Sequence, residues 1–403
     1  MTDAPALRMP PPAFLSDPAL APVLAALPEA RIAGGAVRDA LSDRLIADID
    51  LATPRRPEAV IEALTQAGIR AVPTGLEHGT VTAVSGGRGF EITTLRRDEH
   101  TDGRHAVVAY TDDWREDAAR RDFTINALSM TRDGAVFDYF GGIADLRAGV
   151  LRFVGDPATR IAEDYLRILR FFRFFARYGD GGAPDADAVS AIRAAVPGLA
   201  RLSAERVWNE LSRILSVPDP RAAVALMADL GVLAAVVPEG GDPARLDRLV
   251  AAGAPIDPLL RIAAMLTGDA TAFAGRLRLS AAERDRLVAL RAAPSADPTA
   301  GDATLRRLLA NTERSVLIDR TWLDGDPAPA RDALRQRLQT MPQPVFPLEG
   351  RHVLALGIPP GPQVGALLRA VQTWWLEGGC QADATACRAQ LALAAKIPAA
   401  REA

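Results

Sequence analysis

The chain of 403 residues contains almost no lysine: Lys396 is the only one, and the other 46 of its 47 basic residues are arginine. This scarcity excludes the phosphate-binding loop G-x-x-x-x-G-K-[ST] and argues against an enzyme that forms a Schiff base on lysine. The two cysteines, Cys380 and Cys387, cannot form a disulfide framework or supply a zinc site by themselves. The four histidines include no H-E-x-x-H motif, which excludes the common helical zinc proteases.

Long hydrophobic runs and a one-sided charge are also missing. The longest apolar stretch, Ala222 to Pro238, is interrupted by Asp229 and Gly231 and is too short to span a membrane. The N-terminal segment has an early acid, and prolines where a signal peptide needs an apolar core. We therefore expect a cytoplasmic protein without a membrane association. The formal net charge is −3, so any RNA binding has to use a local basic surface.

Hydrophobic periodicity predicts an α/β head followed by helices. Residues 30–53 are expected to form a strand, a glycine turn, a short helix and a second strand. Two β-rich runs, 80–84 and 90–94, flank a glycine-rich segment typical of a hairpin, and we expect 96–115 to be a loop. From about Ile161 onward, leucine and phenylalanine recur at three-residue steps, which predicts a buried helix face.

The rest of the chain is expected to be helical, because proline- and glycine-rich breaks divide it into blocks with helical spacing. These breaks lie at residues 179–184, 217–220, 238–243, 292–301 and 341–350. No tandem repeat or long low-complexity run interrupts this pattern.

Two aspartates, Asp48 and Asp50, are the first candidates for chemistry. On a strand, residues i and i+2 point to one face, so both carboxylates could bind the same divalent cations. Two such ions can orient an attacking hydroxyl and neutralise a leaving pyrophosphate. Upstream, Gly34–Gly35 and Arg38 could supply backbone N–H groups and a forked charge for phosphates. The alternatives are solvated acids at a strand end and a glycine turn beside a surface salt bridge.

These residues belong to an ordered set of motifs that resembles the class II tRNA nucleotidyltransferase and bacterial poly(A) polymerase family. That family is part of the DNA polymerase β-like nucleotidyltransferases. The motifs are G-G-A-V-R-D with D-I-D-L-A-T, T-G-L-E-H-G-T-V-T (74–82), D-G-R-H (102–105), R-R-D-F-T-I-N-A (120–127) and E-D-Y-L-R-I-L-R-F-F-R-F (163–174). The resemblance is strong over residues 32–174 and thin beyond them.

The resemblance implies a fold class, a domain order and a set of site residues. An α+β head with the nucleotidyltransferase sheet (1–149) would precede an all-α neck (150–216), body (217–340) and RNA-binding tail (341–403). Asp48 and Asp50 would be catalytic and would bind Mg²⁺. Independently of the resemblance, Glu91 alternates with Phe90 and Ile92 and could face the metal as a third carboxylate, although an exposed strand glutamate is the commoner case. The residues implied to contact the nucleotide are Gly35, Arg38, Arg121, Asp122, Asp164, Arg167, Arg170 and Arg173.

Asp164 and Arg167 also support a separate chemical argument. They are three residues apart and are expected to be neighbours on one helix face. A carboxylate only accepts hydrogen bonds and a guanidinium only donates them. Cytosine and adenine both offer an amino donor beside a ring-nitrogen acceptor, whereas uracil and guanine present the reversed pair. One Asp–Arg pair could therefore select C and A and reject U and G. The alternative is an ordinary surface ion pair.

The predicted activity is addition of CCA to the 3′ end of tRNA from CTP and ATP, with release of pyrophosphate. An A-adding enzyme or a poly(A) polymerase remains an alternative, although the C-terminus lacks a strongly basic extension. The segment 97–105 occupies the place of the family's flexible loop and retains D-G-R-H, which argues against a CC-adding specialist. An RNA-binding protein with a degenerate head is the non-enzymatic alternative. The retained aspartates and the Asp164/Arg167 pair argue against it. No protein partner is evident.

Overall fold

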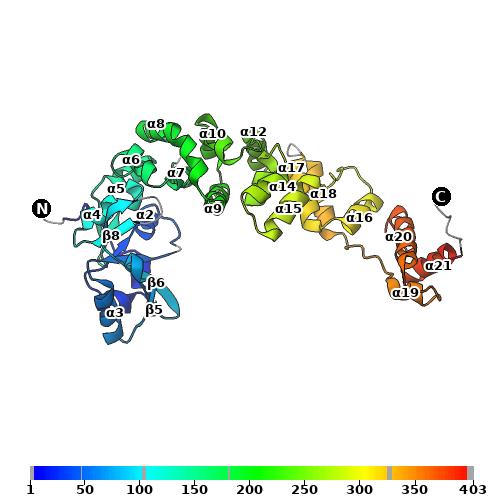
Figure 1. Cartoon of the computed structure of the whole chain (residues 1–403), viewed down its shortest axis with the longest axis horizontal. Helices are drawn as coiled ribbons and strands as arrows, with labels where there is room; N and C mark the ends of the chain where they lie inside the picture. Colours follow the sequence, from blue (N-terminus) through cyan, green and yellow to red (C-terminus); the bar gives the residue numbers. More distant parts are fainter. Residues whose placement is uncertain (1–3, 47, 102–105, 180–181, 325–328, 397–403) are drawn as a thin grey trace. The chain divides into compact units, whose positions relative to one another are not determined.

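The computed structural model describes residues 4–46, 48–101, 106–179, 182–324 and 329–396. The chain packs as two compact units, residues 1–238 and 239–403, and each has hydrophobic clusters of its own. In Figure 1 the first unit runs from blue to green, and the second continues through yellow to red. In the described part of the chain, no helix is both long and apolar enough to cross a bilayer.

The first unit contains an eight-stranded sheet with the order β1-β10-β9-β2-β3-β6-β5-β4. Its strands are β1 (Leu7–Arg8), β2 (Arg31–Ala33), β3 (Asp50–Thr53), β4 (Arg70–Gly75), β5 (Thr80–Ser85), β6 (Arg88–Thr94), β9 (Ser129–Met130) and β10 (Ala135–Phe137). β3 pairs with β6 in parallel, and the other pairings are antiparallel. Val81 and Phe90 of the sheet pack with Val60 and Leu64 of α3 (Pro57–Gln66), which places the core under this helix.

One hairpin in this part of the chain was expected from the sequence, and a second was not. Gly86 and Gly87 join β5 to β6 with φ values of 57° and 77°, the positive angles that a type I′ turn requires. The prediction of a loop over residues 96–115 is wrong, because β7 (Arg96–Thr101) and β8 (Ala106–Tyr110) form a two-stranded sheet. The apolar run A-V-V-A-Y carries strand propensity that the surrounding polar residues concealed. Residues 102–105 lie outside the described part of the chain.

Besides α3, the described part of the first unit contains ten α-helices. They are α1 (Ala21–Ala26), α2 (Gly35–Leu41), α4 (Trp114–Ala119), α5 (Gly142–Ala148), α6 (Pro157–Glu163), α7 (Leu166–Tyr178), α8 (Ala186–Ala195), α9 (Ala204–Leu215), α10 (Arg221–Asp229) and α11 (Val232–Val236). The predicted buried face of α7 is confirmed. Phe171 is fully buried there, and its ring stacks on Phe153 and Phe175 at centroid distances of 6.0 Å. Phe123 packs on Phe153 at 4.9 Å, so aromatic contacts fix α7 to the segment that follows the R-R-D motif.

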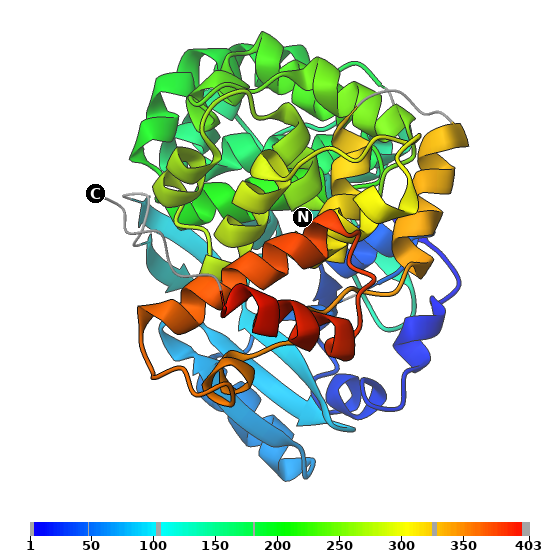
Figure 2. The same cartoon turned by 90° about the vertical axis from the view of Figure 1, so that its right-hand side faces the viewer.

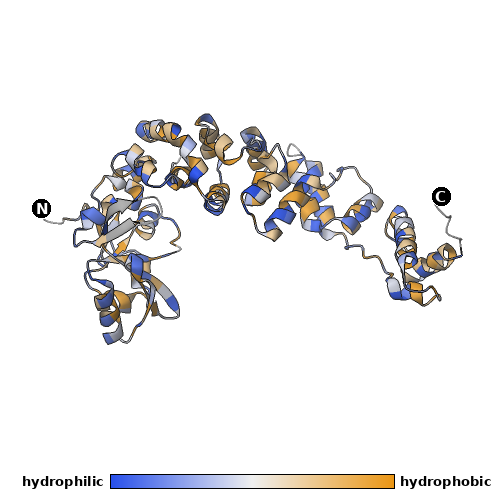
Figure 3. Ribbon diagram, viewed as in Figure 1, coloured by the Kyte–Doolittle hydropathy of each residue, from blue (hydrophilic) through white to orange (hydrophobic). Residues whose placement is uncertain are grey.

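The second unit is helical. Its helices are α12 (Pro243–Ala251), α13 (Pro258–Met265), α14 (Ala270–Arg276), α15 (Ala281–Ala292), α16 (Asp302–Asn311), α17 (Arg314–Leu323), α18 (Pro329–Thr340), α19 (Gly350–Leu354), α20 (Pro362–Glu377) and α21 (Ala384–Ala394). Figure 2 shows α20 and α21 side by side. Trp375 of α20 and Cys387 of α21 are buried in one hydrophobic cluster. Colouring by hydropathy shows that helices of both units carry hydrophobic residues along one side (Figure 3).

The fold confirms the predicted α+β head followed by helices. All five proline- and glycine-rich breaks lie between helices. The boundary between the two units, after Pro238, falls at one of these breaks and inside the predicted body. The finer division into neck, body and tail therefore stays a prediction.

Candidate active site

Asp48 and Asp50 lie where β3 begins, next to β2 and β6. The prediction that one strand carries both aspartates needs correction, because β3 starts at Asp50 and Asp48 precedes it. The alternation of a strand nevertheless extends back to Asp48: Asp48 and Asp50 are exposed, and Ile49 between them is buried. The two carboxylates are therefore turned away from the core together.

Glu91 of β6 lies beside these aspartates. It is the register partner of Asp50 in the parallel pairing of β3 with β6. Partial burial and the negative charges of Glu91 and Asp48 raise the pKa of Asp50, while the nearby Arg121 guanidinium acts in the opposite direction. A divalent cation would relieve this repulsion, so the donor set fits such an ion.

A complete metal cage is not preformed at this edge. Among the described residues, no three Asp, Glu, His or Cys side chains converge closely enough to hold an ion by themselves. This arrangement suits an ion that takes one or two carboxylates from the protein and its other ligands from substrate phosphates and water. The role of Glu91 as a third ligand stays a prediction.

The glycine turn after β2 brings the backbone close to an arginine. Gly34 has φ +66° and precedes α2, and a Cβ atom placed there would lie 2.7 Å from Nη1 of Arg121. Only glycine tolerates both the positive φ and the close approach of the Arg121 guanidinium. At Gly35, a Cβ atom would lie at an ordinary 3.6 Å from Nη2 of Arg38. The geometry thus places the strict glycine requirement at Gly34, and the predicted contact of Gly35 with the nucleotide stays a prediction.

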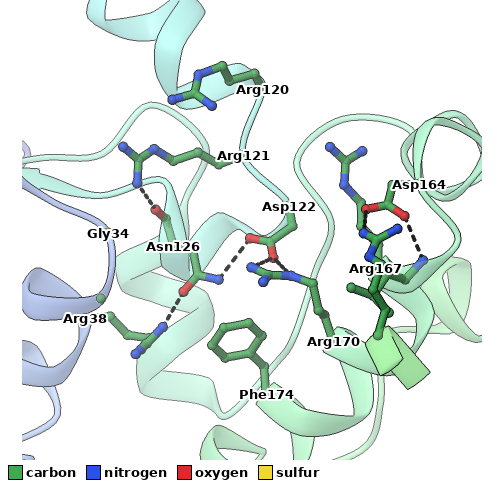
Figure 4. Close-up of a pocket in the computed structure, with 13 residues that line it drawn as sticks. Gly34, Arg38, Arg120, Arg121, Asp122, Asn126, Asp164, Arg167, Arg170 and Phe174 are labelled. Atoms are coloured by element: carbon green, nitrogen blue, oxygen red, sulfur yellow. Dashed lines mark hydrogen bonds and ion pairs between the residues drawn. The ribbon is translucent and has the colours of Figure 1, made fainter. Parts of the chain in front are cut away.

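A cavity of about 490 Å³ opens beside this turn. Figure 4 shows Gly34 and Arg38 at one side, Asp164 and Arg167 at the other, and Asp122 between them. The side chains and glycines that line it are Gly34, Gly35, Arg38, Arg120, Arg121, Asp122, Asn126, Asp164, Leu166, Arg167, Arg170, Phe174 and Arg206. Its volume is typical of a small-ligand site. Six of these residues are arginines and two are aspartates, so the lining suits a polyanion.

The R-R-D motif lies at the centre of this cavity. Arg120 and Arg121 both bind Asp117 of α4, with N–O distances of 2.9 and 3.3 Å. Asp122 accepts hydrogen bonds from Arg170 of α7 and, at 3.0 Å, from Nδ2 of Asn126. Burial alone would raise the pKa of Asp122, but the Arg170 charge and these hydrogen bonds outweigh it and lower the pKa. Arg121 also interacts with Asp50. This interaction connects the cavity to the edge of the sheet that carries Asp48 and Asp50, called the aspartate edge below.

Five residues that line this cavity were not predicted as site residues: Arg120, Asn126, Leu166, Phe174 and Arg206. Asn126 links three arms of the site: its Oδ1 accepts from Arg38, its Nδ2 donates to Asp122, and its carbonyl accepts from Arg121 at 3.2 Å. Phe174 places its ring 5.1 Å from the Arg38 guanidinium. Asn126 was detectable as a polar residue between the apolar Ile125 and Ala127. Phe174 gave no separate signal, because phenylalanine is common throughout α7.

Of the two further arginines predicted on α7, the structure brings one into the cavity. Arg170 lines it, whereas Arg173 lines a neighbouring cavity with Arg44, Arg177 and Arg213. Nε of Arg173 lies 3.1 Å from Glu210 of α9. The rotation of about 60° for each three-residue step on an ideal helix explains this divergence.

Asp164 and Arg167 both line the cavity, but they do not share a helix face as predicted. α6 ends before Asp164, whose extended backbone (φ −155°) separates α6 from α7. Its Oδ2 accepts from Arg206 of α9 at 2.7 Å, and its Oδ1 from the Leu166 N–H at 3.1 Å. Arg167 forms its ion pair with Glu163.

Both members of this pair retain capacity to bind a base. A carboxylate accepts up to about four hydrogen bonds, and Asp164 uses two. Arg167 binds Glu163 and the Arg160 carbonyl through Nη1, and its Nη2 has no hydrogen-bond partner among the described residues. An acceptor and a donor are therefore available side by side at this end of the cavity.

Comparisons with known proteins agree with this geometry. Residues 30–152 match the family described as "Poly A polymerase head domain", and residues 183–241 match "Probable RNA and SrmB- binding site of polymerase A". The chain is 36% identical to mouse (Mus musculus) "CCA tRNA nucleotidyltransferase 1, mitochondrial" over 378 residues, which cover 87% of this chain and 83% of the relative. It is 38% identical to a Streptococcus gordonii "CCA-adding enzyme" over 234 residues, covering 58% and 57% of the two chains. A solved structure of the Bacillus stearothermophilus CCA-adding enzyme in complex with CTP superimposes with a TM-score of 0.76 at 27% identity, covering 94% of this chain and 98% of that one.

Proposed function

The chain belongs to the CCA tRNA nucleotidyltransferase family, and from this we propose that it adds C, C and A to the 3′ end of tRNA. CTP and ATP are the nucleotide donors, and pyrophosphate is the leaving group. The observation that carries the proposal is the cavity, in which an arginine-rich lining connects the aspartate edge to a paired acceptor and donor. The relative whose structure holds CTP has the same fold over almost the whole chain.

The reaction depends on a divalent cation, for which we propose Mg²⁺. Asp48 and Asp50 would hold it. When bound, the ion would lower the pKa of the attacking 3′-hydroxyl and neutralise charge on the leaving pyrophosphate. Burial, together with the negative charges of Glu91 and Asp48, raises the pKa of Asp50. A bound cation would offset these negative charges.

The side chains of the cavity position the nucleotide. Arg38 and Arg121, with the backbone at Gly34, face the place where phosphates would lie next to the aspartate edge. Asp122, held by Arg170 and Asn126, can accept from a ribose hydroxyl. The RNA 3′-hydroxyl would then attack the α-phosphorus, forming one P–O bond as the bond to pyrophosphate breaks. Catalysis by this chain consists mainly of alignment and charge neutralisation.

Base selection would occur at Asp164 and Arg167. The Asp164 carboxylate would accept from the amino group of cytosine or adenine, and Nη2 of Arg167 would donate to the adjacent ring nitrogen. Uracil or guanine would place two acceptors or two donors against each other and leave them unpaired. Arg206 holds the carboxylate in position from the opposite side.

Two related activities, addition of the terminal A and synthesis of a poly(A) tail, would use the same site differently. An A-adding enzyme would add only the last nucleotide, and a poly(A) polymerase would continue past it. The non-enzymatic alternative, an RNA-binding protein with a degenerate head, is disfavoured because both aspartates and the Asp164/Arg167 pair are retained. We also propose a cytoplasmic location. The free thiols of Cys380 and Cys387 fit a reducing compartment.

The assignment of Asp50 is tested by incorporation of radiolabelled CTP into a tRNA transcript that lacks its CCA end. Asp50→Asn removes one charge from an exposed position and should lower the rate by at least about a hundredfold, comparable to the effect of EDTA. Glu58→Gln, at an exposed position on α3, is the matched control and should leave the rate unchanged. Incorporation by Asp50→Asn at the parent rate, or by the parent in EDTA, would contradict the proposed mechanism.

A further inference from the structure

The second unit contains a small cavity of about 150 Å³ that lies apart from the active site and is lined by four arginines. Arg245 and Arg248 come from α12, Arg291 from α15 and Arg320 from α17. Apolar side chains and Trp322 complete the wall, and no carboxylate occurs among the described residues that line it. Three helices thus direct guanidinium groups toward one space.

Nearby carboxylates balance only part of this charge. Asp242 lies 3.4 Å from Arg245, and Asp324 lies 3.1 Å from Arg320. Four guanidiniums against these two carboxylates leave a net charge of +2. Burial, together with the positive charges of Arg245 and Arg320, lowers the pKa of Arg291, which is the expected effect of crowding like charges. An anion in the cavity would relieve this repulsion.

Capping of helix ends is the structural alternative, since arginines near a helix C-terminus can bind its last carbonyls. Arg291 donates to the Ala263 carbonyl and Arg320 to the Leu290 carbonyl, both at 3.3 Å. These contacts leave Nε of Arg320 buried without a hydrogen-bond partner among the described residues. Arg248 is exposed, and its side chain forms no hydrogen bond or ion pair within the described part of the chain. Capping therefore accounts for two of the four arginines at most.

We infer that this cavity binds a phosphate group, and that in the working enzyme this group is a backbone phosphodiester of the RNA. The cavity has about five times the ~30 Å³ that one water occupies in the liquid, which suits a phosphate with a few waters. It is too small for a nucleotide, because typical ligand pockets begin at about 300 Å³. Arginine forks match the geometry of phosphate oxygens.

Two features favour RNA over a free anion as the source of the phosphate. The exposed Arg248 leaves one side of the site open to a ligand that continues beyond the cavity. The segment 183–241, which matches a family described as a probable RNA-binding site, ends four residues before Arg245. This part of the inference rests on the proposed tRNA substrate. It extends that proposal by placing a contact with the RNA backbone on α12, α15 and α17.

The test measures the affinity of the full chain for a tRNA transcript lacking CCA at several salt concentrations. Arg248→Gln and the double variant Arg248→Gln/Arg291→Gln remove charge from the cavity. Each lost phosphate contact should weaken binding several-fold and reduce the slope of log K against log [salt] by about one. Arg307→Gln removes the same charge from an exposed position on α16 outside the cavity, and it should change neither quantity.

The outcomes separate the possible explanations. Unchanged affinity and salt slope in Arg248→Gln, whose exposed side chain is not needed for folding, would overturn the inference. If inorganic phosphate raises the melting temperature of the parent but not of the double variant, while RNA affinity stays the same, the site takes a free anion and the RNA assignment is wrong. A parent that binds RNA through this cavity but incorporates no nucleotide would contradict the proposed function and leave the phosphate site standing.

Discussion

Asp164 is the residue on which base selection depends in this account. Its carboxylate has two protein partners, the Leu166 N–H and the Arg206 guanidinium, and both fix its orientation toward the cavity. Selectivity follows from the fixed direction of an acceptor, since a mobile carboxylate could adapt to a different base. Arg206 therefore positions Asp164 from within the lining of the same cavity.

Replacing Asp164 or its partner should alter selectivity in graded steps. Asp164→Ala should lower the ratio of kcat/KM for CTP over UTP at least about tenfold, or abolish incorporation, because the acceptor is lost. Arg206→Gln should lower the same ratio by less, since the carboxylate remains but is less constrained. Arg193→Gln, at an exposed position on α8, is the control. Single-nucleotide incorporation with each of the four nucleotides measures the ratios. If Asp164→Ala kept the selectivity and the rate of the parent, Asp164 would have no part in choosing the base.

Gly34→Ala should lower activity because the added Cβ atom collides with Arg121. A control variant separates this collision from backbone strain. Its positive φ makes alanine strained by about 1–2 kcal/mol, and its Cβ atom would displace the Arg121 guanidinium. Gly141→Ala, at φ +79° with no atom within 4 Å of the added Cβ, carries the strain without the collision. We expect a larger loss of unfolding free energy in Gly34→Ala, because its ψ of −114° lies outside the left-handed region in which Gly141 lies, and a raised KM for CTP in Gly34→Ala alone. Equal KM values would show that Arg121 does not depend on the glycine.

At the scale of elements, α7 organises the site because it has two different sides. Its phenylalanines form the aromatic cluster with Phe123 and Phe153, and its arginines reach the cavities. The ion pair between Arg170 and the buried Asp122 ties the polar side of the helix to the segment after α4. The helix that anchors the fold of the first unit thus also places nucleotide-contacting groups.

The Asp122–Arg170 link should make stability depend on pH. The pKa of Asp122 is lowered in the folded state, so the unfolded chain takes up the proton first as pH falls. The stabilisation is therefore present above the usual carboxyl value and is lost as pH drops through the folded pKa. Between about pH 6 and pH 3, the parent should lose more unfolding free energy than Asp122→Asn, by about 1.4 kcal/mol for each unit of the shift.

Urea unfolding at a series of pH values measures this difference. Asp187→Asn, which removes an exposed carboxylate of α8, is the control and should follow the parent. Parallel curves for the parent and Asp122→Asn would mean that the ion pair contributes nothing to the fold.

Sequence reasoning recovered the elements whose signals are local. The Gly86–Gly87 hairpin and the five breaks between helices follow from turn chemistry, and the buried face of α7 follows from periodicity. Side-chain partners were harder to predict, because they depend on elements distant in sequence. Asp164 binds Arg206, 42 residues away, rather than the nearby Arg167. The polar character of residues 96–101 concealed β7, whose pairing with β8 only the folded chain reveals.

At the scale of the whole molecule, the chain combines an arginine-rich catalytic cavity with a net charge of only −3. Because lysine is nearly absent, contacts with phosphate fall to arginine, whose planar fork suits bidentate binding. Arginines gather in two cavities of the first unit and one of the second, and the small net charge gives no global positive field. This arrangement favours defined phosphate positions over general attraction to nucleic acid.

CCA addition by this chain is tested by sizing the products formed on three tRNA transcripts, ending before CCA, after C and after CC. Each is incubated with Mg²⁺ and with CTP, ATP or both. We predict that three, two and one nucleotides are added respectively, that completion of the first two transcripts needs both nucleotides, and that synthesis then stops. Addition of A to the CC-ended transcript alone, long A tails, or no incorporation on any transcript would contradict the account.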